Sequence, residues 1–132
     1  MRRLAVLMIG ALSAALLLAK PAVAANKGPL DGKVFSSEVG LEGRTTGQRD
    51  KLVFQDGTFR STACDPFGFK EGMYKIAQAD DITTFEAQTL NPDGETMLWR
   101  GNIKGRHIEG RATWAKAGQE PVEHWFKGDL TE

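Results

Sequence analysis

The sequence predicts an all-β protein, a single antiparallel up-and-down barrel of about eight strands, and three observations lead to this prediction. Pairs of turn-forming residues recur between short runs of apolar and β-branched residues. After residue 24, apolar residues never recur at the three- and four-residue spacing of an amphipathic helix. Glycines fall within or at the ends of the predicted strands, where a bend or a crowded barrel interior requires a missing side chain.

Two hairpins define the register of four strands. Asp56-Gly57 suits the positive backbone φ angles of a two-residue turn, which places Phe54 opposite Phe59. In the turn of residues 104–107, Gly105 stands at the first central position, where a type II′ turn needs positive φ. This turn pairs Ile103 with Ile108, Gly101 with Gly110, Trp99 with Ala112 and Met97 with Trp114. One whole face of this hairpin is therefore apolar or small.

The remaining strands complete a meander. They are expected at Lys33 to Leu41, Met73 to Ala79, Ile82 to Leu90 and Val122 to Leu130, with longer connections at Glu42 to Asp50 and Asp65 to Glu71. An open sheet of this size would leave two unpaired edges and an apolar face, and the sequence offers no helix to cover that face. Closure into a barrel removes both problems.

The first 24 residues have the pattern of a secretory signal peptide. Two arginines precede an apolar run from Leu4 to Leu18, and Ala22-Val23-Ala24 supplies the small residues that a signal peptidase reads. We therefore expect a signal peptide over residues 1–24, a barrel domain over residues 25–132, and a periplasmic or secreted protein after cleavage near Ala24. No second apolar stretch approaches the ~20 residues of a membrane-spanning helix, so no membrane span is expected.

Charge and cysteine content narrow the range of partners. The chain's 17 basic residues include Arg2, Arg3 and Lys20, so the expected mature chain keeps 14 basic residues against 17 acidic ones. This mild negative charge argues against nucleic acid as a partner. Cys64 is the single cysteine, so a disulfide within the chain is impossible.

Cys64 is the first candidate site residue. It follows a predicted strand and begins a longer connection near a barrel end, where a thiol could bind a ligand, join two chains or act in redox chemistry. A buried, inert cysteine is the simpler interpretation, because free cysteines are among the most buried residues. No basic residue adjoins Cys64, and we expect Asp65 to raise the pKa of its thiol.

The two histidines do not indicate a metal site. His107 lies in a predicted turn and His124 lies in the last predicted strand, so they form no ligand pair on one strand face. No Gly-x-Ser-x-Gly motif is present, and Asp80-Asp81 is more simply a turn than a catalytic pair. We therefore expect no metal, no cofactor and no catalytic residue.

Aromatic residues point to a binding site inside the barrel. Trp99 and Trp114 share the apolar face of their hairpin, Tyr74 and Phe85 share a face of the preceding hairpin, and Trp125 is expected to point outward. Aromatic side chains commonly line ligand pockets. Core filling is the simpler interpretation of the first two tryptophans, since an eight-stranded barrel is just wide enough for its own side chains or for one small ligand.

The predicted signal peptide, the opening residues Leu30 to Phe35 and the meander of strands together resemble the lipocalin-like, or calycin, barrels. The resemblance covers nearly all of the expected mature chain. A second similarity is to a group of small exported bacterial proteins without assigned function. It is carried by the pattern of aromatic residues, glycines and Cys64 in residues 54–64, by the glycines and isoleucines of residues 101–110, and by Trp114. These resemblances imply the fold and the compartment.

The leading hypothesis is an exported barrel that binds a small, largely apolar ligand in its interior, through Trp99, Trp114, Phe85, Tyr74 and Cys64. The alternative is a protein-interaction module that presents its loops or outer face to an envelope protein. A thiol-dependent enzyme at Cys64 is a weaker alternative. The interior distinguishes the first two hypotheses, because a barrel plugged by its own aromatic residues would leave no cavity and would favour the partner protein.

We expect the mature chain to begin at Ala25. Replacing Ala24 with a bulky residue such as tryptophan should leave the precursor uncleaved, because a signal peptidase requires a small residue at the last position before the cut. The intact mass of the protein exported by its native host measures both. The matched variant Ala24→Gly should still be cleaved, and a cytoplasmic or uncleaved wild-type protein would contradict the prediction.

Overall fold

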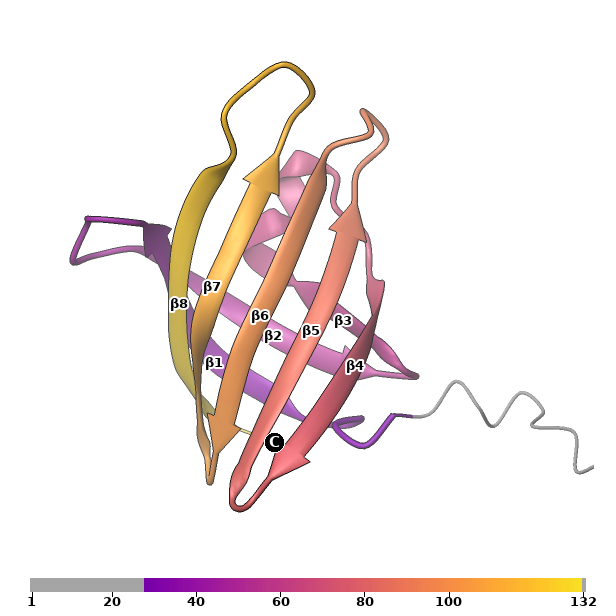
Figure 1. Cartoon of the computed structure of the whole chain (residues 1–132), viewed down its shortest axis with the longest axis vertical. Helices are drawn as coiled ribbons and strands as arrows, with labels where there is room; N and C mark the ends of the chain where they lie inside the picture. The colour runs from indigo at the N-terminus through magenta and orange to yellow at the C-terminus, as the bar shows by residue number, and fades with distance from the viewer. Residues whose placement is uncertain (1–27, 132) are drawn as a thin grey trace, which may run out of the picture.

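The computed structural model describes residues 28–131, which form a closed antiparallel barrel of eight strands (Figure 1). The strands are β1 (Val34–Leu41), β2 (Gln48–Gln55), β3 (Thr58–Ser61), β4 (Gly72–Ala79), β5 (Ile82–Leu90), β6 (Thr96–Lys104), β7 (His107–Ala115) and β8 (Val122–Leu130). Each strand pairs with its neighbours in sequence, and β1 pairs with β8 to close the barrel. The predicted fold class is confirmed. The predicted signal peptide, residues 1–24, and its cleavage site lie outside the described residues.

The hairpin registers agree with those that the turn residues predict. Phe54 pairs with Phe59 across β2 and β3, and Trp99 pairs with Ala112 across β6 and β7. The turn residues adopt the required backbone conformations, because Asp56, Gly57 and Gly105 all have positive φ. Since a slip of one residue would turn every side chain to the other face, these turns decide which residues face the interior.

Aromatic side chains fill the middle of the barrel. Neighbouring ring centroids lie between 5.0 and 6.1 Å apart, within the usual range for favourable aromatic contacts. The rings belong to Phe54, Phe59, Phe85, Trp99 and Phe126, which we call the aromatic cluster. Glycine makes room for it, since a Cβ on Gly101 would lie 2.7 Å from ring atoms of both Phe85 and Phe126. The interior of the barrel is therefore solid at its middle.

The segment before β1 packs against the turn between β2 and β3 and seals that part of the barrel. The Asp31 carboxylate accepts hydrogen bonds from the Tyr74 hydroxyl at 2.8 Å and from the Gly57 amide at 3.0 Å. The Tyr74 hydroxyl in turn accepts one from the amide of the buried residue Leu30 at 2.8 Å. Burial, followed by the hydrogen bond to Asp31, raises the pKa of Tyr74 to about 12. Tyr74 therefore holds the N-terminal segment in place as a neutral phenol.

Two connections differ from the prediction. The connection expected at Glu42 to Asp50 is shorter, because β2 already begins at Gln48, which pairs with Val39 of β1. The second contains a short 3₁₀ helix, η2 (Thr62–Phe67), which the sequence did not predict. Six residues in a 3₁₀ helix are too few to show the apolar spacing of an amphipathic helix.

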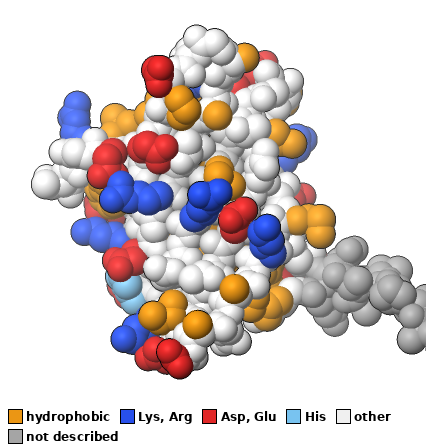
Figure 2. Space-filling view, in the orientation of Figure 1, with side chains coloured by type: hydrophobic (Ala, Val, Ile, Leu, Met, Phe, Trp, Pro, Cys, Tyr) orange, Lys and Arg blue, Asp and Glu red, His pale blue; other side chains and the backbone are white. Residues whose placement is uncertain are grey.

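The outer face carries charges of both signs. Figure 2 shows basic and acidic side chains interspersed over the face formed by β4 to β8, and Glu86 contacts both Lys75 and Arg100 there. The outer face formed by β4 to β8 is therefore predominantly a charged, solvated surface. Exposed ion pairs of this kind contribute little to stability. Within residues 28–131, no helix is long and apolar enough to cross a membrane.

Gly105→Val should lower the free energy of unfolding by about 1 kcal/mol or more, because Gly105 has φ of 58° and a β-branched residue is strained there. Gly105→Asn should cost much less, since asparagine tolerates positive φ better. A Cβ at this position meets no atom within 4 Å, so backbone conformation alone separates the two variants. Urea denaturation measures both, and equal effects would contradict the conformational explanation.

Candidate functional site

The barrel opens into a pocket of about 450 Å³, which we call the mouth pocket. Residues at the ends of β1, β6, β7 and β8 form it, together with η2, the β1–β2 connection and the start of β2. Its apolar wall includes Val39, Phe67, Met97, Trp99, Ala112 and Trp114. Trp99 also belongs to the aromatic cluster and is fully buried, so the cluster closes the inner end of the pocket. The volume lies within the roughly 300–1,000 Å³ typical of small-molecule sites.

Exposed apolar side chains surround the opening. Leu41 is 45% exposed, Phe67 52% and Val122 38%. Leu41 and Phe67 line the mouth pocket, and Val122 pairs with its wall residue Trp114. The hollow of about 720 Å³ elsewhere on the barrel differs in character, because it is lined only by polar residues and glycine. An apolar pocket with an apolar rim is typical of a binding surface.

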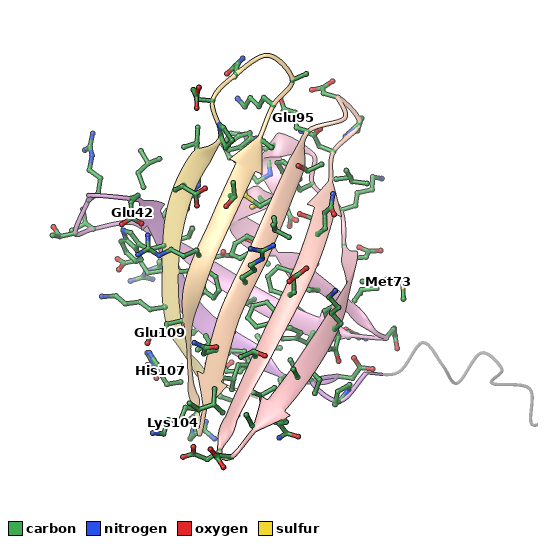
Figure 3. The ribbon with its side chains drawn as sticks, viewed as in Figure 1. Glu42, Met73, Glu95, Lys104, His107 and Glu109 are labelled. Atoms are coloured by element: carbon green, nitrogen blue, oxygen red, sulfur yellow. The ribbon has the colours of Figure 1, made fainter. Side chains whose placement is uncertain are left out.

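Trp114 is held in place by contacts on several sides. Its indole Nε1 donates a hydrogen bond to Glu95 Oε1 at 3.1 Å, and Glu95 lies at the upper end of the barrel in Figure 3. The rings of Phe67 and Phe69 make edge contacts with it, at centroid distances of 5.1 and 5.6 Å. The Lys116 ammonium lies 4.3 Å from the centre of the Trp114 ring. This wall of the pocket is therefore formed before any ligand arrives.

The connection between β1 and β2 folds outward onto the barrel. Trp125 points outward, as predicted, and its indole Nε1 donates a hydrogen bond to the Arg44 carbonyl oxygen at 2.8 Å. Glu42, which Figure 3 labels on this connection, forms an ion pair with Arg111 of β7. These two contacts hold the connection against the outer face of β7 and β8, and its residues Arg44, Thr46 and Gly47 line one side of the mouth pocket.

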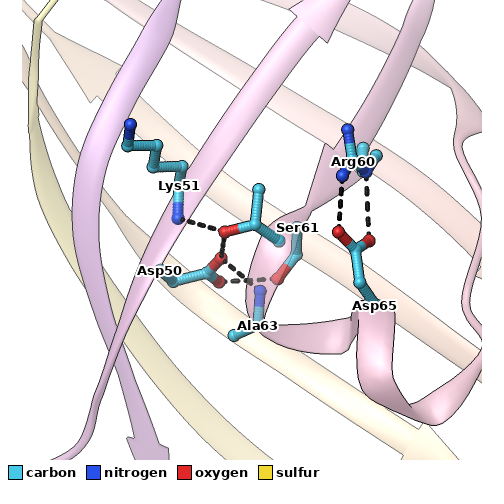
Figure 4. A network of polar contacts seen from close by, with 7 residues as sticks. Asp50, Lys51, Arg60, Ser61, Ala63 and Asp65 are labelled. Atoms are coloured by element: carbon cyan, nitrogen blue, oxygen red, sulfur yellow. Dashed lines mark hydrogen bonds and ion pairs between the residues drawn. The ribbon is translucent and has the colours of Figure 1, made fainter.

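A buried carboxylate anchors η2, which carries Cys64 into the pocket lining. Asp50 accepts hydrogen bonds from Ser61 Oγ at 2.6 Å and from the Ala63 amide at 3.0 Å (Figure 4). Burial raises the pKa of Asp50, although these hydrogen bonds oppose the increase. A two-pronged hydrogen bond from Arg60 to Asp65 ties η2 to β3 and lowers the pKa of Asp65. The sequence alone does not reveal this network, because its residues lie on three different elements, β2, β3 and η2.

The environment of Cys64 does not suit a nucleophile. Burial raises the pKa of its thiol to about 11, and the carboxylates of Asp50 and Asp65 add to the increase, while Ser61 opposes it. The effect expected of Asp65 is thus confirmed in direction. Reactive cysteines need a lowered pKa, which supplies the thiolate near neutral pH. At neutral pH, Cys64 is instead a protonated, weakly polar part of the pocket wall.

The structure brings together some of the predicted site residues and separates others. Trp99, Trp114 and Cys64 meet at the mouth pocket, whereas Phe85 lies in the aromatic cluster and Tyr74 lies against the N-terminal segment. The pocket also includes residues that the sequence did not indicate for a ligand, among them Val39, Phe67 and Met97, and it includes His124, which was considered only as a metal ligand. The alternation of inward-facing residues along the first strand is the signal that could have found Val39.

Three buried polar atoms of the described residues have no hydrogen-bond partner. They are Thr89 Oγ1, Trp99 Nε1 and His124 Nδ1. Thr89 pairs with Met97, and Ala112 pairs with both Trp99 and His124, so all three unpaired atoms belong to residues in or beside the pocket lining. Buried polar groups nearly always form hydrogen bonds. Three unpaired polar atoms in or beside the pocket lining therefore indicate that this part of the barrel is not optimised for stability.

Neither a metal centre nor a known relative defines this site. Within residues 28–131, no three or more His, Cys, Asp or Glu side chains are grouped so that they could hold a metal ion. Comparison with protein family models, with curated proteins and with solved structures found no match to this chain. The fold and the site together define a closed antiparallel barrel with a packed middle and an apolar pocket at its mouth.

Asp50→Ala should lower the free energy of unfolding by roughly 1–3 kcal/mol, because Ser61 Oγ and the Ala63 amide would lose a buried acceptor. Asp50→Asn should cost less, since its amide oxygen still accepts a hydrogen bond. The pKa of Asp50 is raised in the folded state, so its contribution to stability is complete below the unfolded pKa and is lost as pH rises through the folded pKa. Relative to Asp50→Asn, the wild-type protein should therefore lose stability as pH increases above about 4. Urea denaturation across pH measures this difference, and parallel pH profiles would contradict the assignment.

Proposed function

We propose that this protein binds a small, largely apolar molecule in the mouth pocket. The observation that carries the proposal is an apolar pocket of about 450 Å³ whose inner end is closed by Trp99 and whose rim exposes Leu41 and Phe67. A ligand there would cover apolar surface that water now contacts, and the release of that water favours binding. The fixed position of Trp114 reduces the ordering cost of binding.

The packed middle of the barrel limits the ligand to the outer part of the interior. Phe85 and Phe126 occupy the space further in, with ring centroids 6.1 Å apart. The ligand would therefore enter and leave through the mouth, without movement of a strand. The sequence resembles the lipocalin-like barrels, and we propose that the ligand site lies at the barrel opening. We further propose that the protein acts in the periplasm or outside the cell. The signal-peptide pattern of residues 1–24 supports this compartment.

A partner protein is the second candidate for the same surface. Phe67 is more than half exposed although it packs against Trp114, and an apolar side chain from another protein would cover both. The solid middle of the barrel favours this alternative, because most of the interior is not available to a ligand. A purified small molecule that binds saturably on its own separates the two functions.

N-phenyl-1-naphthylamine, a neutral apolar dye, should bind the wild-type protein at one saturable site with increased fluorescence. Ala112→Leu should weaken this binding at least tenfold, because Ala112 lines the pocket beside Trp99 and the added bulk takes the ligand's space. The matched change Ala77→Leu, at an exposed position of β4, should leave binding unchanged. Fluorescence titration measures all three proteins.

Circular dichroism shows whether each variant is folded. If Ala112→Leu fails to fold through overpacking, Ala63→Leu places the same bulk in the pocket from η2 and should block the dye instead. Absence of saturable dye binding to the folded wild-type protein would contradict the proposed function and favour the partner protein. Binding that survives both pocket substitutions would place the dye elsewhere and contradict the site.

A further inference from the structure

We infer that the ligand of the mouth pocket is an amphipathic anion, with its apolar body inside the pocket and its negative group beside Arg44. The inference rests on the proposed function, and it adds the sign of the ligand's charge and the orientation of the ligand. It follows from the charges that line the pocket, from the contacts that those charges already make, and from the side of the pocket on which the polar groups lie.

Of the residues that the structure describes, Arg44 is the one permanently charged residue that lines the pocket, and no Asp or Glu among them lines it. The nearby carboxylate of Glu42 is occupied by its ion pair with Arg111. Among residues 28–131, the Arg44 guanidinium has no ion-pair or hydrogen-bond partner. Arg44 is exposed at the rim, so its guanidinium can attract a negative charge with the modest strength of an exposed charge pair. A cationic ligand would find no carboxylate among these lining residues.

The polar groups lie on one side of the pocket. The Arg44 amide donates a hydrogen bond to the Leu41 carbonyl oxygen at 2.9 Å, and Leu41 pairs with His124 of β8. Arg44 and His124 therefore belong to the part of the rim built by β1 and β8, and the imidazole Nδ1 of His124 has no partner. Met97 and Phe67 line the pocket from β6 and η2. A ligand with a polar head and an apolar body matches this division.

Two hydrogen bonds fix the main chain of Arg44, and this limits the positions that its guanidinium group can reach. Its carbonyl oxygen accepts the hydrogen bond from Trp125, and its amide is bonded to Leu41. The carboxylate of Glu95, which contacts the pocket residue Trp114, already accepts hydrogen bonds from Trp114 Nε1 and from Asn91 Nδ2 at 2.9 Å. This acid is thus engaged on its own side of the opening, and the guanidinium remains the available charge.

Two dyes that differ by one sulfonate test the inference. 1-Anilinonaphthalene-8-sulfonate carries a negative charge, and N-phenyl-1-naphthylamine has the same aromatic body without it. The wild-type protein should bind the sulfonate several-fold more tightly than the neutral dye. Arg44→Gln should weaken sulfonate binding about three- to fivefold, the range expected for an exposed charge pair, and leave neutral-dye binding unchanged. Added salt should reduce the wild-type preference, because it screens the charge.

Arg49→Gln is the matched control, because it removes the same charge from an exposed position on β2 outside the pocket lining. It should leave the binding of both dyes unchanged. Equal loss of sulfonate binding in the Arg44 and Arg49 variants would reduce the effect to net charge and overturn the inference. If both dyes bind equally and Arg44→Gln changes the binding of neither, the inference of an anionic ligand is contradicted, while the proposed binding pocket is still supported. If neither dye binds the folded protein, the proposed function itself fails.

Discussion

The packing of aromatic rings around Trp99 is the constraint on which the rest of the structure depends. A barrel of eight strands has an interior just wide enough for its own side chains. Here the aromatic cluster fills the middle, and Gly101 supplies the space that Phe85 and Phe126 need. Closure also gives every strand two partners, although only two residue pairs join β3 to β4, so stability comes from one continuous core and a ladder that is short at this one junction. The space available to a ligand therefore depends on how side chains and connections close each end of the barrel.

The openings are finished in different ways. At one opening, Tyr74 binds Asp31 and Leu30 of the N-terminal segment, and the buried side chain of Leu30 completes the packing there. At the mouth, Ala112 is too small to fill the interior, and the β1–β2 connection is held outside by Trp125. A pocket results because a small inward-facing residue and an outward connection coincide at one opening. The three unpaired polar atoms lie in this same part of the barrel.

Turn chemistry explains why so much of the fold could be predicted. Asp56-Gly57 and Gly105 specify their hairpins locally, and alternation then assigns the facing of every residue along the paired strands. The helix η2 escaped prediction, because it depends on Asp50, a partner in another strand. The division of the aromatic residues between core and pocket also depends on contacts across the barrel. Trp99 and Phe85 are indistinguishable by pattern, yet only Trp99 reaches the pocket.

Asp50 links the stability of the barrel to the shape of its pocket. A buried carboxylate with neutral partners is costly when ionised, and its raised pKa reflects this cost. In return it fixes the first turn of η2, which supplies Ala63, Cys64 and Phe67 to the pocket lining. The same carboxylate helps to keep the Cys64 thiol protonated. Since the thiolate is the form that oxidises readily, this arrangement protects the unpaired cysteine from oxidation. One buried carboxylate thus helps to maintain both the wall of the pocket and the low reactivity of its thiol.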